Sequence, residues 1–177
     1  MGMKGLGRLF DLQSVIMPVD LAGGANAGAL VSLENAGGVT FVFIKNQGIA
    51  GDDPVLTFRE AQDGSATNEQ DLDVVTEYFS KTETAAAALT GAETWSRFTQ
   101  SAGDIDGDNA SAEVGLSGED EALVAIYIDA DDLSDGYTHV TVDIADTGSG
   151  GASLGAVLAI VHDLAVQRAP QNLAATK

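Results

Sequence analysis

The sequence contains no cysteine and only two histidines, which limits the chemistry open to the chain. The absence of cysteine excludes disulfides, thiolate nucleophiles and cysteine-ligated metals, and it fits a protein that folds in a reducing cytoplasm. A tetrahedral zinc site would have to add carboxylates to both histidines, His139 and His162. Successive side chains of a strand point to opposite faces, so His162 is not expected to pair with Asp163. Both histidines are therefore interpreted as structural.

Basic residues are also scarce, with eight Lys or Arg against 27 Asp or Glu and a formal net charge of −19. Nucleic-acid binding is not expected, because neutralising phosphates needs clusters of Lys and Arg, and an anionic membrane would repel the chain. No Lys or Arg occurs between Arg97 and Arg168, whereas Lys4 and Arg8 lie in a first stretch of ten residues that has no acid. This asymmetry predicts an amino-terminal docking element of opposite sign to the acidic body.

Long hydrophobic runs are absent too. The longest, at residues 154–161, is far shorter than the ~20 residues that a membrane-spanning helix needs. The apolar residues after Arg8 are interrupted by Asp11 and Gln13, so no secretory signal is expected. A chain of 177 residues suits a single domain, and at this length it can bury roughly 70 % of its unfolded surface without a metal or a disulfide.

What the sequence does contain is a series of short runs rich in β-branched and aromatic residues with a period of two. In one of them Leu56, Phe58 and Glu60 share a face. Another, at 122–130, is strongly apolar and is expected to be buried. The eight runs span residues 29–34, 39–46, 54–62, 73–82, 94–100, 122–130, 138–145 and 154–162. Turn-forming segments separate them, and the segment 35–38 (Asn-Ala-Gly-Gly) is typical of a hairpin connection.

This pattern predicts an all-β fold, an antiparallel β-sandwich of jelly-roll-like or immunoglobulin-like type with little helix. The one helix candidate, at 84–90, is a turn or two long and ends at Gly91. The expected organisation is an amino-terminal arm or first strand at 1–17, a β-sandwich domain at 18–168 and a carboxyl-terminal tail at 169–177.

Two groups of acidic residues are candidate metal sites. Asp104, Asp106 and Asp108 alternate, and alternating carboxylates can converge on a hard cation such as Ca²⁺, although the spacing is not that of an EF-hand. A second group lies at 129–135, with four aspartates. The alternative for both groups is a solvated loop. No serine-nucleophile motif and no phosphate-binding loop is recognised, so neither an enzymatic role nor a cofactor is predicted.

The apolar residues near the amino terminus are candidates for a contact with another subunit. They precede the first well-defined run and lie beside the basic residues of the arm. An arm of this kind adds a strand to a neighbour or lies in its groove, while the alternative is a first strand in the chain's own sheet. The candidate contact residues are Leu9, Phe10, Leu12, Val15 and Ile16.

Several segments, in order, resemble the small virion structural proteins of tailed bacteriophages, of the capsid auxiliary or decoration type. The resemblance covers most of residues 9–168, and the stretch 162–168 departs from the ending that such proteins often have. It implies a non-enzymatic head or neck component and brings no functional residues with it. The segments that carry it are 14–20, 38–45, 48–58, 94–95, 128–133, 135–140 and 154–158.

Together these observations predict a capsid decoration protein on the outer surface of a phage head, because a very acidic body should avoid packaged DNA. The expected partners are the major capsid protein and copies of the chain itself, as a homotrimer by analogy, with no nucleic acid and no membrane. The expected location is the virion, after synthesis in the host cytoplasm. Two alternatives stay open, namely a head-to-tail or tail structural component and a Ca²⁺- or carbohydrate-binding β-sandwich module.

Overall fold

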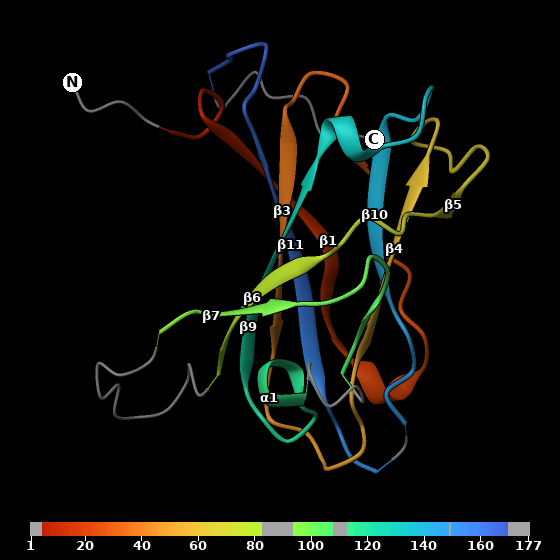
Figure 1. Cartoon of the computed structure of the whole chain (residues 1–177), viewed down its shortest axis with the longest axis vertical. Helices are drawn as coiled ribbons and strands as arrows, with labels where there is room; N and C mark the ends of the chain where they lie inside the picture. The colour runs from red at the N-terminus through yellow and green to blue at the C-terminus, as the bar shows by residue number, and fades with distance from the viewer. Residues whose placement is uncertain (1–4, 83–93, 108–112, 149, 170–177) are drawn as a thin grey trace.

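A computed structural model describes residues 5–82, 94–107, 113–148 and 150–169. It forms two antiparallel sheets packed face to face (Figure 1), so the predicted all-β sandwich is confirmed. The six-stranded sheet has, in spatial order, β1 (Phe10–Asp20), β11 (Leu154–His162), β3 (Gly38–Lys45), β9 (Ala122–Asp129), β6 (Glu77–Thr82) and β7 (Ser96–Thr99). The five-stranded sheet has β2 (Val31–Ser32), β10 (His139–Ile144), β4 (Val55–Ala61) and β5 (Gln70–Asp71), with β8 (Ile105–Asp106) also paired to β4.

The helical content of the described chain is small. One α-helical turn, α1 (Glu113–Leu116), precedes β9, and two 3₁₀ turns cover Leu21–Gly23 (η1) and Ala130–Asp132 (η2). The helix predicted at 84–90 lies outside the described residues. The short strands β5 and β8 and the turn α1 have no counterpart among the predicted elements.

The core lies between the sheets and is built from the inward residues of each strand. Phe41 of β3 and Phe58 of β4 are fully buried and meet across the two layers, with ring centroids 6.2 Å apart. The predicted alternation in 54–62 is confirmed, since Leu56, Phe58 and Glu60 are all buried. Strands that bury every second side chain in this way need a second sheet to cover them, which is what holds the two layers together.

The segment 35–38 is not a hairpin, as the sequence suggested. It joins β2 in the five-stranded sheet to β3 in the six-stranded sheet, so the chain changes layers there. A short turn with two glycines allows either connection. The sequence of the turn therefore does not say which sheet the next strand will join.

The first strand belongs to the chain's own sheet. β1 pairs with β11 from Phe10 opposite His162 to Asp20 opposite Leu154. The register shifts around Val15, and there the Ala29 N–H donates to the Val15 carbonyl at 2.9 Å. The bulge thus links β1 to the segment leading into β2 and joins the two sheets along one side. Residues 10–17 are accordingly a strand rather than a free arm.

Candidate functional site

The outward side of the six-stranded sheet is apolar across its central strands. Leu158 of β11 pairs with Val42 of β3, which pairs with Ala125 of β9, which pairs with Phe79 of β6. The row on one side is Ala156, Ile44 and Leu123, and the row on the other is Ile160, Thr40 and Tyr127; both are apolar except for the uncharged Thr40. We call this surface the apolar sheet face. Its members are Leu12, Val42, Ile44, Phe79, Leu123, Ala125, Tyr127, Leu154, Ala156, Leu158 and Ile160.

The large side chains of the apolar sheet face are open to solvent in the described chain. Leu12 is 53 % exposed, Leu154 52 %, and Tyr127 50 %. Contiguous apolar patches of a few hundred Å² on the surface of a folded protein are often functional interaction sites. The run 122–130 was expected to be buried, and only its inward half is.

Charged side chains lie at the borders of the apolar sheet face. Lys81 and Glu77 are on β6 near one edge, while Asp129 is at one end of β9. The outward side of the other sheet is different, because β4 and β10 present Arg59 and Asp143 there. The two sheets therefore offer opposite surfaces, one polar and charged and one apolar.

The predicted subunit-contact residues divide between surface and core. Leu9 is 58 % exposed, Leu12 lies on the apolar sheet face, and Phe10 is half-buried. Val15 and Ile16 are buried in the chain's own core, so their assignment to a subunit contact is wrong. The reason is the bulge at Val15, which turns two successive side chains inward where strict alternation would turn only one.

The predicted calcium ligands are only partly described. Asp104 and Asp106 flank the buried Ile105 in and beside β8, and Asp104 Oδ2 accepts a hydrogen bond from Thr57 Oγ1 at 2.9 Å. Asp108 lies outside the described residues. Within residues 5–82, 94–107, 113–148 and 150–169, no three His, Asp or Glu side chains group as metal ligands.

The second acidic group has a structural role. Asp129 precedes η2 and its carboxylate accepts the Asp131 N–H at 3.1 Å, while Asp132 accepts the Asp129 N–H at 3.1 Å. This reciprocal arrangement is a capping box, which satisfies backbone donors at the start of a helical turn. Asp129 also accepts a hydrogen bond from the Tyr127 hydroxyl, so it fixes one end of the apolar sheet face.

The two histidines occupy different surroundings. His139 is buried, with Nδ1 2.8 Å from Thr138 Oγ1. His162 stacks on Tyr127, with ring centroids 5.2 Å apart, and its Nδ1 lies 3.0 Å from Asp163 Oδ2. The expectation that His162 and Asp163 would not pair was wrong. Asp163 follows the end of β11 with φ +54°, and this left-handed conformation brings its side chain back toward His162.

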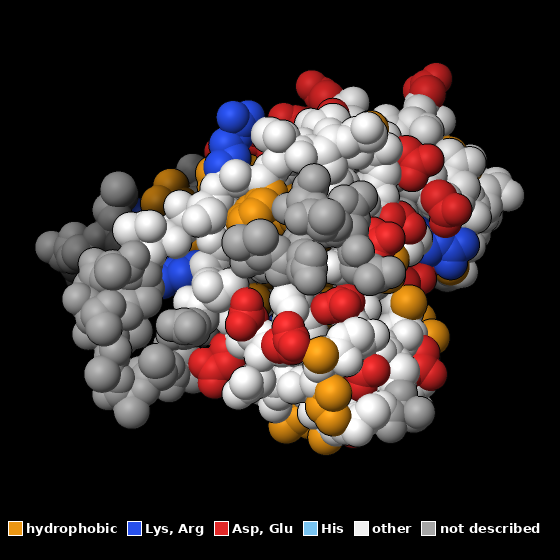
Figure 2. Space-filling view, turned by 60° about the horizontal axis from the view of Figure 1, so that its bottom comes forward, with side chains coloured by type: hydrophobic (Ala, Val, Ile, Leu, Met, Phe, Trp, Pro, Cys, Tyr) orange, Lys and Arg blue, Asp and Glu red, His pale blue; other side chains and the backbone are white. Residues whose placement is uncertain are grey.

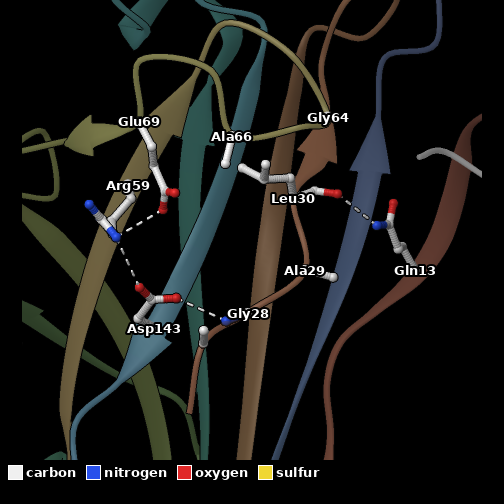
Figure 3. Close-up of a pocket in the computed structure, with 10 residues that line it drawn as sticks. Gln13, Gly28, Ala29, Leu30, Arg59, Gly64, Ala66, Glu69 and Asp143 are labelled. Carbon is white, nitrogen blue, oxygen red and sulfur yellow. Dashed lines mark hydrogen bonds and ion pairs between the residues drawn. The ribbon is translucent and has the colours of Figure 1, made fainter. Parts of the chain in front are cut away.

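A pocket of about 470 Å³ opens on the five-stranded sheet, between the segment 27–30 and the loop that contains Gly64 and Ala66 (Figure 3). Arg59 Nη1 lies 2.9 Å from Glu69 Oε1 and 3.7 Å from Asp143 Oδ2, and Arg59 Nε lies 3.4 Å from Asp71 Oδ1. Three carboxylates thus surround one guanidinium, and the pocket would repel an anionic ligand. We interpret Arg59 and its three carboxylate partners as an ion-pair cluster that connects the loop to the sheet.

Lys45, at the end of β3, is a buried cation. Its Nζ donates to the carbonyls of Gly118 (3.1 Å), Asn46 (3.3 Å) and Asp120. Burial lowers the pKa of Lys45 to about 8, although the nearby carboxylates, Asp120 first, oppose the shift. In the core between the sheets, burial raises the pKa of Tyr78 to about 12. Both shifts make the stability of the fold depend on pH.

We expect the free energy of unfolding to rise between about pH 8 and pH 10. Folded Lys45 loses its proton in this range while unfolded lysine keeps it, so the unfolded state binds more protons and stability increases with pH. The full shift in the pKa of Lys45 corresponds to about 3 kcal/mol. Partial solvation of the ammonium group reduces the expected rise in the free energy of unfolding to about 2 kcal/mol. Above about pH 10 stability should fall, because unfolded tyrosine ionises before folded Tyr78 does.

Urea unfolding at a series of pH values measures this dependence. Lys45→Met should flatten the rise below pH 10, and Tyr78→Phe should flatten the fall above it. The slopes are the readout, because either substitution also changes stability at neutral pH. An unchanged rise in Lys45→Met would assign the titration to a different group.

Comparisons with protein-family models, with curated protein sequences and with solved structures find no match. In the described part of the chain no helix is long and apolar enough to cross a membrane. The features available for assigning a function are therefore the distribution of charge, the apolar sheet face and the resemblance of the segments named above.

Proposed function

We propose that this chain is a non-enzymatic structural protein of a phage particle, and specifically a capsid decoration protein on the outer surface of the head. Its partners would be other protein subunits, namely the major capsid protein and copies of the chain itself. The observation that carries the proposal is the apolar sheet face, which is large, uncharged at its centre and uncovered in the described chain.

The separation of charged and apolar surface supports a role in assembly. The chain has a net charge of −19 and therefore many charged residues. Yet no charged side chain occupies an outward position of β3 or β11 within the apolar sheet face. Depletion of charge at the centre and a polar rim are typical of protein–protein interfaces. The apolar sheet face is thus a surface suited to packing against protein.

The acidic surface supports a position outside the shell. Asp and Glu side chains are spread over the side of the molecule shown in Figure 2, where Lys and Arg side chains are few. Packaged DNA would repel such a surface, whereas the outer side of a shell faces solvent, where negative charge favours solubility. The resemblance to virion proteins of the decoration type leads to the same location.

The proposal is tested on purified particles of the phage that encodes the chain. We expect the chain in a fixed ratio to the major capsid protein by quantitative mass spectrometry, and its density on the outer shell in an image reconstruction. Binding of the purified protein to shells that lack it should saturate at the same ratio. Absence of the chain from purified particles would contradict the proposal.

The same reconstruction distinguishes the head-to-tail or tail alternative. A component of the neck or tail would give density at one vertex or along the tail, in few copies per particle. That outcome would keep the structural role and correct the position.

A further inference from the structure

We infer that the apolar sheet face is covered by the same face of a second copy of this chain, in a two-fold symmetric dimer. The inference rests on the proposed role as a structural subunit and names the partner of that surface. Four features of the described residues support it: the size of the face, the protected edges of the sheet, the position of its charges and the alternation of large and small side chains.

The face is large enough to form the centre of a stable interface. Its members span five neighbouring strands, β1, β11, β3, β9 and β6. Alternate residues of a strand face the same side, so each outward residue covers about 4.8 Å by about 6.6 Å, and the eleven members of the face give roughly 350 Å². Specific interfaces bury about 800 Å² per partner, of which the centre is apolar and the rim polar. The face therefore has the extent expected of the apolar centre.

The edges of the six-stranded sheet are poorly suited to association. At one edge β1 contains Pro18 and two register shifts, and its Val15 carbonyl already accepts the Ala29 N–H. Proline and bulges are features that block the addition of a strand from another chain. At the other edge β7 covers only four residues, Ser96–Thr99. Association through the face of the sheet is thus favoured over association through an edge.

Charge favours a second copy as the occupant. A partner for this face must present a surface that is equally broad and free of charge, and the chain itself provides one. Contact through the outward side of the other sheet would bring Asp71 and Asp143 of two copies together, in chains that each carry −19. Contact through the apolar sheet face leaves the carboxylates at the rim or in solvent, where water screens their repulsion.

A two-fold axis that crosses the strands at the row of Leu158 and Val42 makes the face complementary to itself. The axis exchanges the rows on either side, so Ile160 lies over Ala156 and Ile44 lies over Thr40. On these two central strands each pair combines a larger with a smaller side chain, which allows the surfaces to interlock there. On β9 the axis lays Tyr127 over Leu123. The same axis places Lys81 of β6 over Glu77 of the same strand in the other copy, because the two residues lie one row on either side of Phe79, so that opposite charges meet at the rim.

This symmetry gives a dimer in place of the trimer expected by analogy. A two-fold contact uses one patch twice, whereas a ring of three needs two different patches that fit each other. The described residues offer one broad uncharged patch. One self-complementary surface therefore closes after two copies.

The test is the mass of the purified full-length protein in solution, measured by sedimentation equilibrium. We expect a mass near 36.2 kDa, twice the 18.1 kDa of one chain, at micromolar concentrations. Leu158→Glu should weaken dimerisation at least 100-fold, because it places a carboxylate at the centre of the contact. Ile49→Glu is the matched control, since Ile49 is similarly exposed but lies in the loop after β3, and this variant should stay dimeric.

Circular dichroism checks that each variant is folded. If Leu158→Glu does not fold, Tyr127→Lys serves in its place, because Tyr127 is half exposed and its replacement leaves the core untouched. A wild-type mass of 18.1 kDa up to millimolar concentration would overturn the inference, and the face would then belong to another segment of the chain or to the capsid protein. A trimer, or equal dimerisation of wild type and both face variants, would also overturn it.

The outcomes keep this inference separate from the proposed function. A wild-type dimer that is absent from purified particles would contradict the virion role and leave the dimer standing. A monomer found on the outer shell would contradict the dimer and leave the virion role standing.

Discussion

Phe41→Ala is expected to lower the free energy of unfolding by about 3–5 kcal/mol, the range for removing a fully buried phenylalanine. Phe41 has no exposed surface, and its ring faces Phe58 of the opposite sheet. Alanine at this position removes the main contact across the centre of the sandwich and leaves a cavity that the surrounding strands cannot fill without bending. Urea unfolding of wild type and variant measures the loss.

Phe41→Leu is the control for this substitution. Leucine keeps most of the apolar volume, so its cost should be clearly smaller than that of alanine. The loss expected for Phe41→Ala is large for a domain, because the total stability of a domain is typically about 5–15 kcal/mol. A loss below about 1 kcal/mol for Phe41→Ala would contradict the packing of the two sheets at this point.

Glu60→Ala is expected to cost about 2–4 kcal/mol, although glutamate is usually a surface residue. Glu60 is 1 % exposed, and its two carboxylate oxygens accept hydrogen bonds from Gln70 Nε2 at 2.6 Å and from the Ser134 N–H at 2.7 Å. The carboxylate thereby connects β4 to β5 and to the segment after η2. Removing it leaves two donors without their acceptor, and the backbone N–H has little freedom to find another.

Glu77→Ala is the matched control, since it is the same substitution at an exposed ion pair with Arg97. Exposed pairs contribute about 0–1 kcal/mol, so this variant should be close to wild type. Glu60→Gln should fall between the two, because its amide keeps one acceptor oxygen. Equal losses for Glu60→Ala and Glu77→Ala would contradict the role assigned to Glu60.

The strands were largely predictable because their pattern is local. The expected runs 39–46, 54–62 and 154–162 match β3, β4 and β11 to within a residue at each end. Side chains that alternate along a strand give the same signal wherever the strand is placed. Strands of two residues, such as β5 and β8, carry no such signal, because pairing with β4 alone defines them.

The arrangement of the strands was less predictable. Nothing in the glycines of 35–38 indicates that the chain changes sheets there. The left-handed conformation of Asp163, which brings it to His162, is also unexpected for a residue other than glycine. Both depend on where distant strands are placed, and a local pattern does not contain that information.

The sequence contains a signal for the apolar sheet face, but that signal was interpreted as burial within the chain's own core. Strands buried on one side alternate apolar and polar residues, whereas 122–128 and 154–161 are apolar on both sides. Such runs suggest burial on both sides. The described chain covers only the inward side of β9 and β11, and the second apolar side is the one for which we propose a partner.

The pairing of β1 with β11 has a consequence for the order of folding. These two strands stand side by side, yet they are separated by about 140 residues of chain. During synthesis at about 5–20 residues per second, β1 would wait roughly 7–30 s for its neighbour to leave the ribosome. Until then β3 also lacks the strand that separates it from β1. The six-stranded sheet is thus completed only after β11 has been synthesised, and until then the nascent chain exposes unpaired strand edges, which favour aggregation.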